Sequence, residues 1–344
     1  MSGRDAPSGG APGAFLAACR RQSAPHRPIW IMRQAGRYLP EYRQLRARVD
    51  FETLTRTPEL AAEVTLQPLR RFELDAAILF SDIMTPLQGM GVELTFEPAP
   101  VVREPIRSAA QIAALPALEP ARDVPFVLET IRQVRRGVPR GVPLIGFAGA
   151  PFTLLCYLVC GRPSKEFAPA RTFLYAQPAD AERLLTHLAD AMAAYLTAQA
   201  AAGAQALMLF ESWAGLLGVS EYARFALPAV RRTLAALKPL GVPLIYYLNQ
   251  GSALMGTVRP RRGRRGRRLA LTAFGGTSGA RARQSGAGQP RPRGAVRAAR
   301  RAHAGGRGRT YRSRQRPGTY LQPGPRHLAG HRSGCGGAPR GLRA

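Results

Sequence analysis

The chain has 344 residues, 45% of them hydrophobic, which is enough for one large domain or two small ones with a buried core. A peptide-like or wholly disordered protein is therefore excluded. The net charge of +29 would ordinarily indicate a nucleic-acid or membrane-surface partner, but the charge is unevenly distributed. Residues 256–344 contain 23 arginines and no acidic residue, whereas residues 1–255 contain the other 27 basic side chains and all 21 acidic ones, a net +6.

Short apolar runs bounded by Gly or Pro alternate with longer Ala-, Leu- and Arg-rich stretches of helical period. In chain order, the pattern predicts one strand followed by four helix–strand pairs. The predicted strands are Ile29–Met32, Ala76–Phe80, Pro143–Phe147, Ala206–Phe210 and Pro243–Leu248, and the predicted helices are Pro58–Phe72, Val124–Arg136, Ala179–Ala201 and Ser220–Leu240. This alternation indicates repeated βα units. In an α/β barrel the residues at the C-terminal strand ends face the active site, so functional motifs are sought there.

The first motif follows the first predicted strand, in the string PIWIMRQAGRYLPEYR of residues 28–43. A Gln-Ala-Gly turn separates Arg33 from Arg37. Two guanidinium groups in one tight loop suit a polycarboxylate, which each can bind through two parallel hydrogen bonds. For an isolated RxxxR pattern, the commoner explanation is that exposed arginines simply solvate a loop.

Two further motifs follow the second and third predicted strands. Asp82 comes directly after the strand ending at Phe80, a position where a lone aspartate is more often a helix cap or turn residue. The string GFAGAPFTL of residues 146–154 is a small-residue turn that permits close backbone approach, and Tyr157 then offers a hydroxyl on an aromatic ring. A structural strand–helix turn is the simpler interpretation of the small residues.

The fourth motif, FESWAG at residues 210–215, follows the fourth predicted strand. Together the four strings resemble the signatures of the uroporphyrinogen decarboxylase family over residues 14–255. In the last one, Glu211 stands where the family usually has aspartate. That side chain is one methylene longer, so the geometry around it is the point at which this chain departs from the family.

The resemblance implies a (β/α)8 TIM barrel and a lyase that removes four acetate carboxyl groups from uroporphyrinogen III, giving coproporphyrinogen III in haem biosynthesis. It implies that Asp82 is catalytic and accepts hydrogen bonds from pyrrole N–H groups, with Arg33 and Arg37 as further catalytic candidates. The substrate-binding residues implied are Arg33, Gln34, Ala35, Gly36, Arg37, Asp82, Tyr157 and Ser212. It also implies a homodimer without metal or organic cofactor, and the sequence has no GxGxxG, Walker, HExxH or CxxC motif.

After Met255 the family's late motifs, close to VDW, QGNLDP and HIFNLGHGI, are not present as written. When each codon is re-read from its second base, however, the genetic code permits GVDW at residues 266–269, QGNLDP at 287–292 and HIFNLGHGI at 319–327. All three motifs recur in one register and in the right order. We therefore predict one frameshift between about Leu254 and Arg261, from one inserted base or two lost ones.

This interpretation divides the chain into a short disordered N-terminus at 1–13, a partial barrel at 14–255, and a basic, out-of-frame and disordered tail at 256–344. The barrel would lack about three strands and the histidine of the last family motif, so we expect the chain as written to be inactive.

Two alternatives stay open: a corrinoid-linked methyltransferase of the same superfamily, which should show a zinc-binding His/Cys set, and a nucleic-acid-binding protein that depends on the basic tail.

Targeting and redox features predict a cytoplasmic protein that is not bound to a membrane and has no specific nucleic-acid partner. The first dozen residues lack the basic-then-apolar order of a signal peptide, and no apolar run approaches the length of a membrane span. The four cysteines are too few and too irregularly spaced for a disulfide framework. A reducing compartment is the natural expectation.

Overall fold

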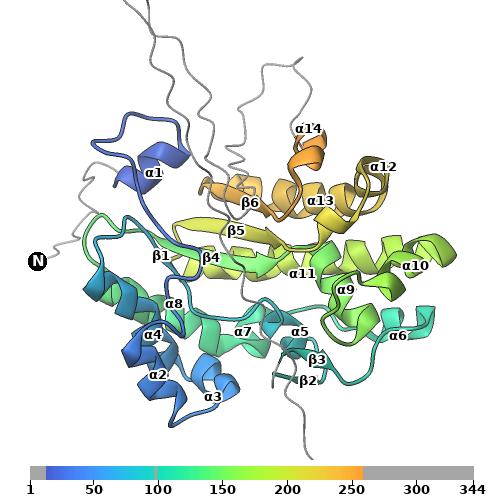
Figure 1. Cartoon of the computed structure of the whole chain (residues 1–344), viewed down its shortest axis with the longest axis horizontal. Helices are drawn as coiled ribbons and strands as arrows, with labels where there is room; N and C mark the ends of the chain where they lie inside the picture. The colour runs from blue at the N-terminus through green and yellow to red at the C-terminus, as the bar shows by residue number, and fades with distance from the viewer. Residues whose placement is uncertain (1–12, 97–98, 259–344) are drawn as a thin grey trace, which may run out of the picture. The chain divides into compact units, whose positions relative to one another are not determined.

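A computed structural model describes residues 13–96 and 99–258, all of which belong to one compact unit (Figure 1). The predictions made for residues 1–12 and 259–344 lie outside the described residues. Of the predicted tail, only Gly256 to Val258 are described, and they lie in the short helix α14 (Met255–Val258).

The centre of the fold is a parallel four-stranded sheet in the order β1 (Ala77–Ile78), β4 (Leu144–Gly149), β5 (Ala206–Glu211) and β6 (Leu244–Leu248). Neighbouring strands follow one another along the chain, which is the arrangement that right-handed βα units produce. Four of the five predicted strands are confirmed by these elements. Within the described residues, β1 and β6 each have a neighbouring strand on one side only.

The predicted strand Ile29–Met32 is wrong, because the segment has no regular strand structure. It begins to pair with the sheet, since the carbonyl of Ile29 accepts a hydrogen bond from Asp75 N at 2.8 Å. The buried side chain of Gln34 then takes the place of further strand pairing. Its Nε2 donates to Ala76 O at 3.1 Å, and its Oε1 accepts from Ile31 N at 3.2 Å. A side-chain amide therefore satisfies main-chain groups that strand pairing would otherwise satisfy.

The four predicted helices are confirmed, with small shifts at their ends. They correspond to α4 (Pro58–Arg71), α8 (Pro125–Gly137), α11 (Pro178–Ala202) and α13 (Leu227–Leu237). Consecutive helices pack side by side, and α4, α8 and α11 also contact the sheet (Figure 1). The remaining elements are α1 (Ala14–Cys19), α2 (Pro40–Arg46), α3 (Phe51–Arg56), α5 (Thr85–Gly89), β2 (Leu94–Thr95), β3 (Val101–Val102), α6 (Ala109–Ala114), α7 (Pro120–Asp123), α9 (Pro151–Cys160), α10 (Ala168–Ala176), η1 (Ala214–Leu216) and η4 (Ser252–Leu254).

The helix predicted at Ser220–Leu240 is not uniform. It starts with the short α12 (Val219–Glu221), widens into a π-helical turn, η2 (Tyr222–Ala226), and ends in a 3-10 turn, η3 (Lys238–Leu240). The wide turn lies just before Pro228, which has no N–H to donate to the carbonyl four residues earlier. The local hydrogen-bonding pattern therefore changes where proline interrupts it.

The two faces of the sheet are packed differently. On one face, Gln199 of α11 exchanges hydrogen bonds with the main chain of Phe147, accepting from its N at 2.9 Å and donating to its O at 2.8 Å. A Cβ at Gly146 would lie 2.4 Å from Gln199 Oε1, so this close approach needs glycine. On the other face, the rings of Phe147, Phe210 and Tyr247 form a row with centroid separations of 5.3 and 5.7 Å.

Among the described residues, no helix is both long enough and apolar enough to cross a bilayer.

Candidate active site

The predicted site residues follow the carboxyl ends of the strands, which share one edge of a parallel sheet. Asp82 follows β1, Tyr157 lies in α9 directly after β4, and Ser212 follows β5. The loop with Arg33 and Arg37 is anchored by Gln34 to Ala76, just before β1, and the charge of Arg33 acts on Asp82. The fold therefore brings segments from four parts of the chain to the same region of the structure.

Asp82 lies in the turn between β1 and α5. Its Oδ1 accepts a hydrogen bond from Met84 N at 2.8 Å, the short-range turn contact that the commoner interpretation predicted. Burial raises the pKa of the Asp82 carboxyl, while the Met84 N–H and then the positive charge of Arg33 act in the opposite direction. A carboxyl that forms a turn thus also lies within electrostatic reach of an arginine.

Tyr157 brings an aromatic wall to the same place. Its ring lies 5.6 Å from that of Phe167 and 6.4 Å from that of Trp213, measured between centroids. Burial raises the pKa of the Tyr157 hydroxyl, the charge of Asp82 raises it further, and Arg33 lowers it. Asp82, Arg33 and Tyr157 are therefore within electrostatic reach of one another, and Trp213, which contacts the Tyr157 ring, is the sequence neighbour of Ser212.

The 33–37 loop divides into buried and exposed positions. Gln34 is fully buried, and its main-chain carbonyl also accepts a hydrogen bond from the Tyr38 hydroxyl. Arg33 and Arg37 are exposed, while Ala35 and Gly36 are partly buried. Gln34 thus anchors the loop. Its proposed contact with substrate stays a prediction, since its amide already bonds to the main chain.

Arg37 is the least constrained of the predicted residues. Within the part of the chain that the structure describes, no hydrogen bond or ion pair joins its side chain to the other predicted residues. An exposed guanidinium beside the buried Gln34 is free to meet a ligand carboxylate. The role assigned to Arg37 from the sequence therefore stays a prediction.

Ser212 is held through its main chain. Its N–H donates to Thr153 Oγ1 at 2.8 Å, and its carbonyl accepts from Asn249 Nδ2 at 3.1 Å. No role was predicted from the sequence for Thr153 or Asn249. The available signal was their position, because one lies in the first turn after β4 and the other directly follows β6.

Glu211, where the chain departs from the usual family residue, is fully buried behind Ser212. Its Oε1 accepts from Thr153 Oγ1 at 2.5 Å, and its Oε2 accepts from the Tyr246 hydroxyl at 3.5 Å. Burial raises the pKa of the Glu211 carboxyl from 4.5 to about 7, although hydrogen bonds from Thr153 and Tyr246 oppose the shift. Strand alternation places this carboxyl on the opposite face of β5 from Ser212.

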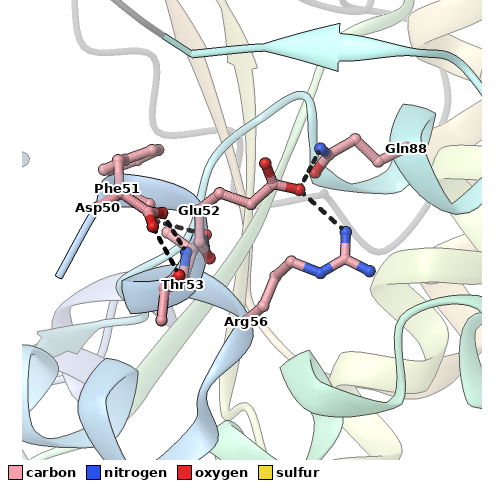
Figure 2. A network of polar contacts seen from close by, with 7 residues as sticks. Asp50, Phe51, Glu52, Thr53, Arg56 and Gln88 are labelled. Carbon is pink, nitrogen blue, oxygen red and sulfur yellow. Dashed lines mark hydrogen bonds and ion pairs between the residues drawn. The ribbon is translucent and has the colours of Figure 1, made fainter.

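A second polar network supports the segment that follows Asp82 (Figure 2). Glu52 of α3 accepts hydrogen bonds at Oε1 from Gln88 Nε2 of α5 at 3.2 Å and from an Arg56 guanidinium nitrogen at 3.4 Å. Asp50 caps α3, accepting from Thr53 N at 2.7 Å. The helix that begins just after Asp82 is thereby connected to α3. The sequence motifs gave no indication of this support.

No group of three or more His, Cys, Asp or Glu side chains within residues 13–96 and 99–258 is arranged to hold a metal ion. The zinc-binding His/Cys set expected for a corrinoid-linked methyltransferase is therefore not found in this range.

Fold and site define an α/β barrel-type protein that has a partly buried carboxyl and an aromatic hydroxyl near its strand ends, both within electrostatic reach of an arginine. Residues 12–260 match the family model described as "Uroporphyrinogen decarboxylase (URO-D)". The chain belongs to the uroporphyrinogen decarboxylase family. The fold of this family is a TIM barrel, so the open parallel sheet is an incomplete (β/α)8 barrel, as the sequence predicted.

Individual relatives agree with the family match. The chain is 51% identical to uroporphyrinogen decarboxylase from Syntrophotalea carbinolica over 244 residues, 71% of each chain. It is 43% identical to that from Carboxydothermus hydrogenoformans over 246 residues, 71% of this chain and 70% of the relative. Among solved structures, a methyltransferase from Methanosarcina mazei shares the fold at 21% identity and a TM-score of 0.57, covering 68% of each chain.

Proposed function

We propose that the gene encodes a uroporphyrinogen decarboxylase, a carboxy-lyase that converts the four acetate side chains of uroporphyrinogen III into methyl groups. The observation that carries this proposal is the family match, and it is supported by the electrostatic interaction of Asp82 with Arg33 and Tyr157 near the strand ends. The reaction as proposed needs neither a metal nor an organic cofactor.

The chemistry requires a positive charge on the pyrrole ring and a grip on many carboxylates. A proton adds to a ring carbon, the electron pair of the bond to the leaving carboxylate moves into the ring, and carbon dioxide departs. A proton then adds to the former acetate carbon, and the ring proton is lost. Asp82 would stabilise the cationic ring from a site with little water, where electrostatic interactions are strong.

The remaining predicted residues would hold the substrate. Arg33 and Arg37 would bind carboxylates through paired hydrogen bonds, and either could also assist proton delivery. The Ser212 hydroxyl and the Tyr157 hydroxyl would add polar contacts at the opposite wall. The proposed contact set is Arg33, Gln34, Ala35, Gly36, Arg37, Asp82, Tyr157 and Ser212.

We further propose that the reading frame changes between about Leu254 and Arg261. Three observations support this: the family match ends at residue 260, acidic residues are absent after Glu221, and three family motifs recur in one shifted register. Residues 14–255 would be the barrel portion and 256–344 the out-of-frame portion. An unclosed barrel has unpaired strand edges, so the chain as written would be aggregation-prone and inactive.

The frame-corrected protein would be a cytoplasmic homodimer without a specific nucleic-acid partner. Binding of nucleic acid by the arginine-rich segment would count as a function only if it survived deletion of that segment. The structural likeness to a methyltransferase, at 21% identity, supports the fold alone.

The test joins sequencing with an assay. The DNA around codons 250–265 is resequenced, and a protein with the corrected frame is assayed for coproporphyrinogen and carbon dioxide formed from uroporphyrinogen. We expect both products. The decarboxylase proposal fails if a folded, frame-corrected protein forms neither, and the frameshift proposal fails if no single change restores the three motifs.

A further inference from the structure

The main chain of Ser212 is held on both sides by side chains from neighbouring strand ends. Thr153 Oγ1, from the first turn of α9, accepts from Ser212 N at 2.8 Å. Asn249 Nδ2, directly after β6, donates to Ser212 O at 3.1 Å. The position of Ser212 is thus set by groups outside its own strand.

The Thr153 hydroxyl can accept from Ser212 only while its own hydrogen points elsewhere. A hydroxyl has one hydrogen and two lone pairs. The hydrogen is directed to Glu211 Oε1, 2.5 Å away, which leaves the lone pairs for Ser212 N–H. Thr153 and Glu211 are both fully buried, so water does not compete for either hydrogen bond.

Glu211 is in turn fixed from its other side. Its Oε2 accepts from the Tyr246 hydroxyl at 3.5 Å, and Tyr246 exchanges a hydrogen bond with the Tyr222 hydroxyl at 3.0 Å. Asn249 N also donates to the main-chain carbonyl of Glu211 at 2.9 Å. A buried carboxyl is costly unless it is hydrogen-bonded, and here each of its oxygens has a hydroxyl donor.

From this geometry we propose that Glu211 is a positioning residue, which orients the Thr153 hydroxyl and thereby fixes Ser212 to receive a substrate carboxylate. The inference rests on the proposed function, because Ser212 is assigned to the substrate only there. Glu211 lies on the opposite face of β5 and acts through Thr153, so it does not touch the substrate itself.

The experiment measures hydrogen exchange of the Ser212 amide in the full 344-residue chain, at single-residue resolution and at a concentration where light scattering shows monomers. In Thr153→Val the amide loses its acceptor, so its exchange should accelerate about tenfold or more. Thr153→Ser restores the hydroxyl and should remain close to wild type. Thr233→Val is the control, because it removes another fully buried hydroxyl, one that bonds only to the helix carbonyls of Ala189 and Ala229.

A second pair of variants addresses Glu211. Glu211→Gln keeps an oxygen acceptor for Thr153 and should preserve slow exchange at Ser212, whereas Glu211→Met removes the acceptor and should accelerate it. Wild-type exchange in Thr153→Val or Glu211→Met, failure of Thr153→Ser to restore protection, or equal acceleration in Thr233→Val would each overturn the inference. Exchange is measured without substrate, so this result is independent of whether the protein decarboxylates uroporphyrinogen.

Discussion

The two stretches of sequence on either side of Met255 differ in almost every respect that folding depends on. Residues 14–255 mix acidic, basic and apolar side chains with regular periodicity, and the family match covers them. Residues 256–344 contain arginine, glycine, alanine and proline in abundance and no acidic side chain. In this second stretch the sequence has no sustained apolar periodicity from which helices or strands could be predicted.

This difference shows that composition and charge should be interpreted segment by segment before they are interpreted for the whole chain. The pI near 11.5 of the whole chain would indicate a nucleic-acid partner, yet the segment with the site motifs is only mildly basic. The proposed frameshift would explain this difference in composition by one event in the gene, and correcting the frame by experiment would test it.

The largest expected effect comes from correcting the reading frame, which would remove the difference in composition between the two stretches. Correcting one frame event near codons 255–261 should change a protein without detectable turnover into a dimeric enzyme with an ordinary turnover number, roughly 1–10³ s⁻¹. The measurement is coproporphyrinogen formation by both proteins, with size-exclusion chromatography beside it. If the uncorrected chain is equally soluble and active, the basic segment is genuine protein.

The next effect concerns the carboxyl after β1. In the frame-corrected protein, Asp82→Asn keeps the shape but removes the charge, so turnover should fall by at least ~10²-fold. Asp190→Asn is the matched control, since Asp190 forms an exposed ion pair with Arg232 at 2.5 Å and should leave turnover unchanged. Wild-type turnover in Asp82→Asn would remove Asp82 from the mechanism.

A smaller effect is expected at the exposed loop. Arg33→Lys and Arg37→Lys retain the charge but lose the planar fork, so each should weaken substrate binding or turnover about tenfold in the frame-corrected protein. Arg132→Lys, at an exposed ion pair with Glu129, serves as the control. Normal kinetics in both loop variants would contradict the carboxylate-binding role.

The smallest effect is a pH dependence of stability that originates at Glu211. Because burial raises its pKa from 4.5 to about 7, the folded protein binds more protons than the unfolded chain between these values. The contribution of this group to stability is therefore complete below 4.5 and is lost as pH rises through about 7. Chemical unfolding of the frame-corrected protein is measured across this pH window. The free energy of unfolding should decline less steeply with rising pH in Glu211→Gln than in the wild type. An identical decline in both proteins would contradict the assignment of this pH dependence to Glu211.

The sequence was sufficient for the regular part of the fold. Four strands and four helices follow from apolar runs and helical periodicity, and family motifs marked Asp82, Tyr157 and Ser212 at the strand ends. The failure at Ile29–Met32 arose because Gln34 provides the hydrogen bonds that a strand neighbour would supply. Local patterns cannot show which distant main-chain group a side-chain amide will meet.

The contacts that support the site could not be predicted from the sequence motifs for a similar reason. Thr153 and Glu211 are 58 residues apart, and Glu52 and Gln88 are 36 residues apart. Their partnership depends on how the strands and helices align in space. The Glu211 substitution was noticeable in the sequence, but only the packing of α9 against β5 shows where its carboxyl is directed.

The order of the strands has a consequence for synthesis. Since β1, β4, β5 and β6 are neighbours in the sheet in the same order in which they leave the ribosome, each can pair with its predecessor while the chain is still growing. The proposed frame change follows β6 within about a dozen codons, so all four strands of the sheet would be translated in frame before the change occurs. The quality-control machinery of the cell would then meet a nascent protein that has begun to fold correctly and in which β6, within the described residues, has a neighbouring strand on one side only.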